Sequence, residues 1–71
     1  MPTINEVVEK VIEEHSSVLL GFYAFGNLVM FFTPTGKCPN SINKNELRER
    51  LRKETGRRVF IVGFSYLPKE K

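Results

Sequence analysis

Cysteine and histidine are scarce in this 71-residue chain, which contains one of each, Cys38 and His15. A single cysteine excludes a disulfide within the chain. With no disulfide framework and no recognisable signal peptide, we expect a location in the reducing cytoplasm. So few cysteine and histidine side chains also leave no cluster of metal ligands, and we expect neither a metal nor another cofactor.

Catalytic motifs are lacking as well. Gly36-Lys37 resembles the end of a phosphate-binding loop, but Cys38 stands where serine or threonine is required, and Phe31 stands where the first glycine belongs. Neither His15 nor Cys38 has a partner at a spacing that indicates a nucleophile–base pair. We therefore expect a protein that is not an enzyme, with no catalytic residue and no small-molecule substrate.

Charge is missing from residues 16–36, a run of 21 positions that could cross a bilayer as a helix. Gly26-Asn27 at its centre and Pro34 near its end argue against that helix, and an asparagine at mid-bilayer is costly without a partner. We favour a β-hairpin over residues 17–33 and no membrane partner, and a single spanning helix at 16–36 is the minor alternative.

The hairpin follows from Gly26-Asn27, since both residues tolerate the positive φ of a tight turn. A two-residue loop pairs Phe25 with Leu28 and Tyr23 with Met30. Side chains alternate across a strand, yet both faces of this hairpin are apolar, whereas a sheet with one wet face alternates apolar with polar. The second face must therefore be covered by another part of the fold or serve as a binding surface.

Two helices and a third strand surround the hairpin. Residues 3–15 form an amphipathic pattern that Thr3 can cap, with Glu6 completing a capping box. Residues 43–55 predict a second helix, capped by Asn43 and ended by Gly56. Residues 58–67 predict the third strand, and 68–71 a frayed polar tail.

These elements predict a single small domain of class α+β over residues 1–71, in the order α-β-β-α-β. We expect a two-layer sandwich in which both helices cover one face of a three-stranded antiparallel sheet. The favoured strand order is 2-1-3, and the alternative is 1-2-3 with a parallel last pair. Because tyrosine suits a partly wet site, we assign Tyr23 and Tyr66 to the open face. The residues predicted for that face are Leu19, Tyr23, Phe25, Leu28, Met30, Phe32, Phe60, Phe64 and Tyr66.

An exposed apolar face of this size predicts a homo-oligomer, most simply a twofold dimer. The favoured function is a non-enzymatic binding or assembly module that self-associates through the face. The candidate contact residues, for an oligomer or for base stacking, are Tyr23, Phe25, Met30, Phe32, Phe64 and Tyr66.

The charges are unevenly distributed and suggest an alternative, nucleic-acid binding. Residues 1–36 have one lysine against four glutamates, whereas residues 37–58 have eight basic residues against three glutamates. Phosphates would contact the basic helix and its exit, while sheet aromatics would stack bases. The candidates are Lys44, Arg48, Arg52, Arg57 and Arg58. The competing hypotheses are that these cations pair with the acids of the first helix, or that the domain is an adaptor for another protein.

Overall fold

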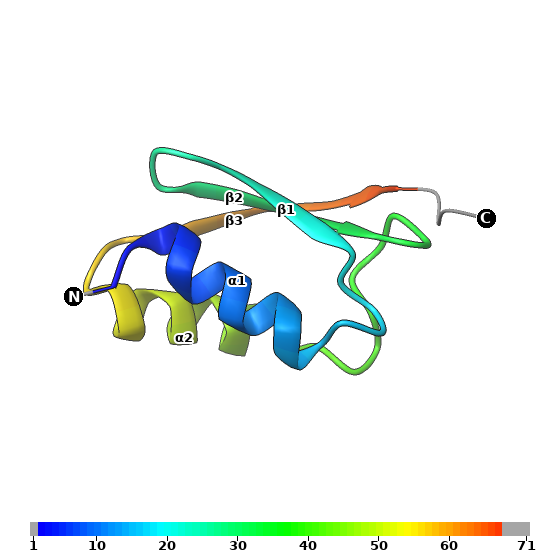
Figure 1. Ribbon diagram of the computed structural model, residues 1–71, viewed down its shortest axis with the longest axis horizontal. Coiled ribbons are helices and arrows are strands. Elements are labelled where there is room, and N and C mark those ends of the chain that lie inside the picture. The colour runs from blue at the N-terminus through cyan, green and yellow to red at the C-terminus, as the bar shows by residue number, and fades with distance from the viewer. Residues whose placement is uncertain (1, 68–71) are drawn as a thin grey trace.

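The structure is a computed structural model that describes residues 2–67, so the predicted tail at 68–71 lies outside the described residues (Figure 1). Two helices and three strands follow one another in the predicted order and make an α+β fold. The elements are α1 (Ile4–Glu14), β1 (Gly21–Phe25), β2 (Leu28–Thr33), α2 (Lys44–Thr55) and β3 (Phe60–Tyr66).

Helix α1 begins as its sequence predicts. The Thr3 hydroxyl accepts a hydrogen bond from the Glu6 backbone N–H at 3.1 Å, and the Glu6 carboxylate accepts one from the Thr3 backbone N–H at 2.8 Å. This capping box satisfies two amides that the helix itself cannot pair. One face of α1 is buried, through Ile4, Val7, Val8 and Val11.

Helix α2 is capped at both ends as predicted. The Asn43 side chain accepts a hydrogen bond from the Glu46 backbone N–H at 3.0 Å, and Gly56 ends the helix in the left-handed conformation. Only Leu47, Leu51 and Thr55 are buried, so most of the surface of α2 remains available to solvent or to a partner.

The hairpin has the predicted turn and register. Gly26 takes φ +60°, and β1 pairs antiparallel with β2 so that Tyr23 lies opposite Met30 and Phe25 opposite Leu28. This pairing fixes which side chains share a face of the sheet.

The predicted strand order 2-1-3 and the all-antiparallel sheet are wrong. The order is β1-β2-β3, and β3 runs parallel to β2, so the sheet is mixed. The two-residue hairpin occupies one edge of β2, and the crossover through α2 returns the chain to the other edge in the same direction. The Phe60 backbone N–H donates to the Asn27 carbonyl at 2.9 Å, which starts β3 beside the hairpin turn.

A bulge in β3 overturns part of the predicted face assignment. Ile61 pairs with Val29 and Gly63 with Met30, which leaves Val62 as an extra residue. Beyond the bulge the alternation of side chains is reversed. Phe64 therefore packs against the core instead of lying on the open face, with its ring stacked on Phe31 at a centroid distance of 5.7 Å.

Tyr66 and Leu19 were also assigned to the wrong place. Tyr66 pairs with the fully buried Thr33, so the alternation puts it on the face opposite Tyr23. Leu19 precedes β1 and is buried in the core at 1% exposure. The alternation of the hairpin does not extend back to Leu19, because the regular strand begins at Gly21.

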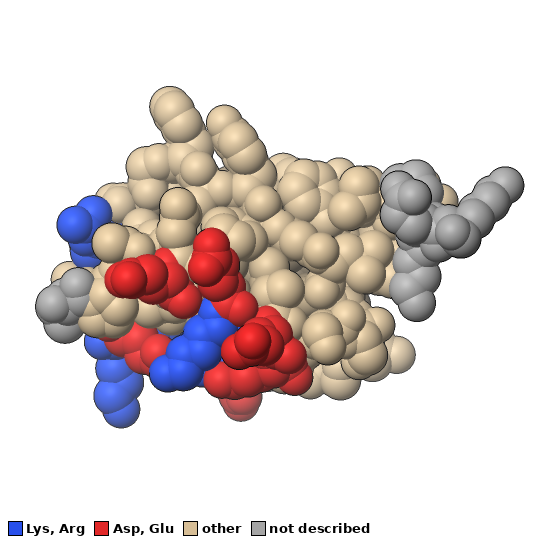
Figure 2. Space-filling model, in the orientation of Figure 1, with Lys and Arg blue, Asp and Glu red and all other residues tan. Residues whose placement is uncertain are grey.

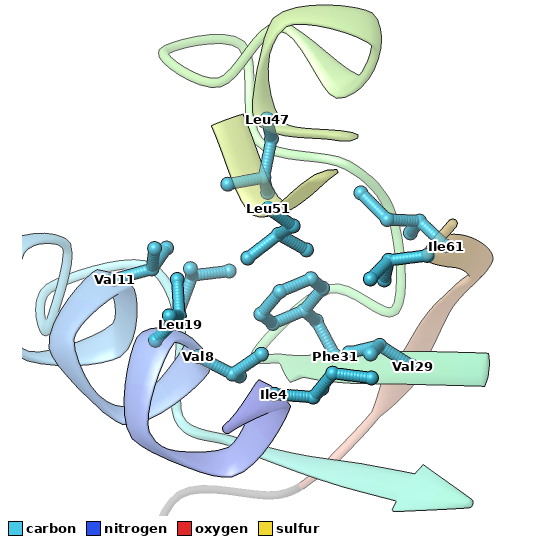
Figure 3. Close-up of a cluster of buried hydrophobic side chains, with 11 residues drawn as sticks. Ile4, Val8, Val11, Leu19, Val29, Phe31, Leu47, Leu51 and Ile61 are labelled. Carbon is cyan, nitrogen blue, oxygen red and sulfur yellow. The ribbon is translucent and has the colours of Figure 1, made fainter. Parts of the chain in front are cut away.

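The core lies between the helices and one face of the sheet. In Figure 1 both helices lie on the same side of the sheet, below it. Phe31 is fully buried and sits in the middle of the cluster that Figure 3 shows, between side chains of α1, α2 and the strands. Within residues 2–67, no helix is both long enough and apolar enough to cross a membrane.

Candidate functional site

The sheet face turned away from the helices is the most distinctive surface of the protein, and we call it the open face. Five of its side chains are exposed by 43–71%. The strands β1, β2 and β3 contain no charged residue at all. Figure 2 shows the consequence, since the surface over the sheet at the top of the view is tan and the charges gather over the helices. The open face comprises Tyr23, Phe25, Leu28, Met30, Phe32, Phe60 and Val62.

The pairing of the strands arranges these side chains in rows across the sheet. Phe25, Leu28 and Phe60 form the row beside the hairpin turn. The next row has Tyr23 and Met30 but ends at Gly63, which contributes no side chain. Beside the side chain that Gly63 lacks, the face has an open apolar hollow of about 420 Å³. Its lining residues are Tyr23, Phe25, Leu28, Met30, Phe32 and Val62.

Four of the six predicted contact residues come together at this hollow, namely Tyr23, Phe25, Met30 and Phe32. Phe64 and Tyr66 do not, for the reasons given above. Sequence reasoning missed Val62, which is 53% exposed on the open face. The signal was the alternation of the strand, which puts Val62 on the same face as Phe60.

The predicted row of cations on α2 is not free of acids. The Glu49 carboxylate lies 3.8 Å from Arg48 Nη2 and 3.9 Å from Arg52 Nη1. Arg52 is also held at the start of β3, since its Nε donates to the carbonyl of Val59, just before the strand, at 2.9 Å and its guanidinium lies 5.1 Å from the centre of the Phe60 ring. Lys44, Arg48 and Arg52 therefore do not form one solvent-facing row without acids.

Arg50, which was not predicted as a site residue, connects the two helices. Its Nη1 and Nη2 donate to the two oxygens of Glu14 at 2.7 and 2.8 Å, and its Nε donates to Glu54 at 2.8 Å. The hydrogen bond from Arg50 lowers the pKa of the Glu14 carboxyl, and the two carboxylates raise the pKa of Arg50. The pairing of the acidic first helix with the basic second helix therefore exists, but it uses Arg50 instead of the predicted row.

Arg57 and Arg58 are exposed and follow the end of α2. Lys44 is exposed at the other end of that helix. Within residues 2–67, none of these three side chains lies within 4 Å of an acidic group. Among the described residues, these three cations therefore have no ion pair.

A second hollow, of about 350 Å³, lies between the end of α1 and the start of α2, and His15, Glu46 and Arg50 are among its lining residues. Cys38 is outside it, and its Sγ donates to the Ile42 carbonyl at 3.4 Å. Among the residues that the structure describes, no three histidine, cysteine or acidic side chains come together as a metal site.

No protein-family model matches the sequence, and neither a curated protein nor a solved structure matches the chain. Functional inference therefore depends on the geometry of this chain.

Proposed function

We propose that this protein is a small binding and assembly module that pairs with a second copy of itself through the open face, and that it acts by binding instead of catalysis. The observation that supports the proposal is an uncharged apolar face on a sheet whose other face is covered by the helices. In this proposal the domain is a two-layer sandwich, and the second copy adds the missing cover. The lone cysteine is consistent with a reducing cytoplasm.

The absence of charge favours a second copy as the partner. A twofold axis brings the same patch of both copies together. A charged residue near the axis would therefore lie next to the same residue of the other copy, and the two like charges would repel each other. The strands offer no such charge. Phe25 is 71% exposed, and a ring that protrudes this far can enter the hollow left by Gly63 on the partner.

The size of the face agrees with a reversible dimer. Its aromatic and aliphatic side chains together expose roughly 500 Å². The largest apolar patch on a monomer is typically ~300–600 Å² and is often functional. Two such faces would bury about 1,000 Å², which is the lower limit for a specific interface. We therefore expect a dissociation constant on the order of 10⁻⁶ M or weaker.

Sedimentation velocity at low and high micromolar concentrations tests the proposal. Wild type should shift from monomer to dimer as the concentration rises. Phe25→Glu should remain monomeric, because the new carboxylate would be buried opposite an apolar surface. Asn5→Glu is the matched control, since it adds the same charge at an exposed position of α1 and should dimerise like wild type. A wild-type protein that stays monomeric throughout the range would refute the proposal.

A further inference from the structure

Four cations and an aromatic ring lie within residues 52–60, where α2 ends and β3 begins, and we call this region the basic corner. It comprises Arg52, Lys53, Arg57, Arg58 and Phe60. We propose that the basic corner binds single-stranded nucleic acid, with the arginines on phosphates and Phe60 against a base. This activity goes beyond the proposed self-association and does not depend on it.

Within residues 2–67, three of the four cations of the basic corner have no ion pair, whereas Arg52 lies 3.9 Å from Glu49. Among residues 2–67, no acidic group lies within 4 Å of Lys53, Arg57 or Arg58. Glu54 is the acid next to them in the sequence, but its carboxylate accepts the hydrogen bond from Arg50. In Figure 2, blue atoms lie at the left edge, where Figure 1 shows α2 leading into β3.

The ordinary role of cations at a helix end does not account for the whole corner. Lys53 and Arg52 lie in the last turn of α2, where positive charge complements the helix dipole. Arg57 and Arg58 come after the Gly56 cap and are both exposed. The dipole effect decreases within the last turn, so these two arginines need another explanation.

Phe60 gives the corner a fixed aromatic surface. Phe60 is 43% exposed, and the Arg52 guanidinium lies over its ring. Arg52 is anchored on the Val59 carbonyl, and the Phe60 backbone N–H is anchored on the Asn27 carbonyl. Unpaired bases stack on aromatic rings and on guanidinium planes, and Arg52 and Phe60 present both together.

Only Phe60 of the basic corner belongs to the open face, and it lies at the edge of that face. Phe60 is at the outer strand of the sheet and does not line the hollow that receives the second copy. A dimer would therefore have two such corners at its rim. A single strand suits this site because Arg52 and Phe60 offer stacking surfaces for a base beside arginines that can bind phosphates.

Fluorescence anisotropy with a labelled oligothymidine tests the site. With about three phosphates neutralised, a slope near −0.7 per phosphate predicts a loss of affinity of roughly 20-fold between about 50 and 200 mM salt. The Arg57→Gln/Arg58→Gln variant should bind at least about tenfold more weakly and with a flatter salt dependence. The matched control is Lys10→Gln/Lys44→Gln, which removes the same charge from exposed positions elsewhere and should bind like wild type.

A second pair of variants tests the stacking. Phe60→Leu should weaken binding while leaving the salt slope unchanged, whereas Phe25→Leu, on the same face, should not weaken it. Thermal unfolding followed by circular dichroism verifies that every variant is folded.

Three results would overturn the inference. They are undetectable binding by folded wild type, equal loss in the arginine variant and its lysine control, or arginine-dependent binding to phosphatidylserine vesicles without binding to the oligonucleotide. A wild-type protein that stays monomeric would refute the proposed self-association but would leave the basic corner intact. The oligonucleotide experiment therefore tests nucleic-acid binding separately from dimerisation.

Discussion

Phe64 stacks on the fully buried Phe31, with the rings 5.7 Å apart and 21° from parallel. The bulge at Val62 makes this contact, because a regular strand would turn Phe64 to the opposite face. Phe64 is thereby part of the core and is lost from the open face.

Replacing Phe64 by alanine should therefore destabilise the protein strongly. We expect about 2 kcal/mol for a half-buried phenylalanine, which corresponds to a fall in melting temperature of about 10 °C in a domain of this size. Thermal unfolding at a concentration where the protein is monomeric measures the effect. Phe25→Ala, on the open face, should melt close to wild type. If the two variants melt alike, the face assignment beyond the bulge is incorrect.

Features set by neighbouring residues could be predicted from the sequence. Gly26-Asn27 determined the turn and the register of the hairpin, and Thr3 and Asn43 located the starts of both helices. Capping and turn formation depend on a few adjacent positions, so a single sequence contains their signals.

Features set by residues that are distant in the sequence could not be predicted in this way. Either β1 or β2 could have accepted β3 at its free edge, and the choice depends on how α2 packs over the sheet. The contact of Arg50 with Glu14 spans 36 positions, and complementary charge on two helices does not identify which side chains meet. The bulge moved Phe64 and Tyr66 to the other face, and Gly63 inside the strand was the only local signal of it.

Leu51 anchors α2 to the core and should be sensitive to truncation. It is fully buried, whereas the other buried leucine of α2, Leu47, is 7% exposed. Leu51→Ala should cost ~2–5 kcal/mol, because the cavity it leaves cannot fill completely. Denaturant unfolding measures the free energy, and Asn45→Ala, at an exposed position of the same helix, is the control. A midpoint within experimental error of wild type would mean that α2 is not docked through Leu51.

The Glu14–Arg50 pair predicts a dependence of stability on pH. The pKa of Glu14 is lowered below its usual value of 4.5 by the hydrogen bond from Arg50. Its contribution is therefore complete above about pH 4.5, the pKa in the unfolded chain, and disappears as the pH falls through the lower pKa of the folded state. Glu14→Gln should lose less stability on acidification than wild type.

Melting temperatures between neutral pH and pH 3 measure this difference. Glu9→Gln is the matched control, since Glu9 is exposed on α1 and makes no ion pair within residues 2–67. The control should follow the wild-type curve. If Glu14→Gln also follows it, the pair does not contribute to stability, as is common for solvent-exposed ion pairs.

The final prediction concerns complementary charges in the proposed dimer. Phe25 and Val62 both line the hollow on the open face and are 71% and 53% exposed. Phe25→Glu and Val62→Lys should each be monomeric, because each variant brings an unpaired charge to an apolar surface. An equal mixture should associate again, since a carboxylate on one copy can meet an ammonium on the other, and added salt should weaken this association. Sedimentation of the mixture against each variant alone measures the recovery. Monomers in the mixture, from a wild type that does dimerise, would show that Phe25 and Val62 do not face each other across the interface.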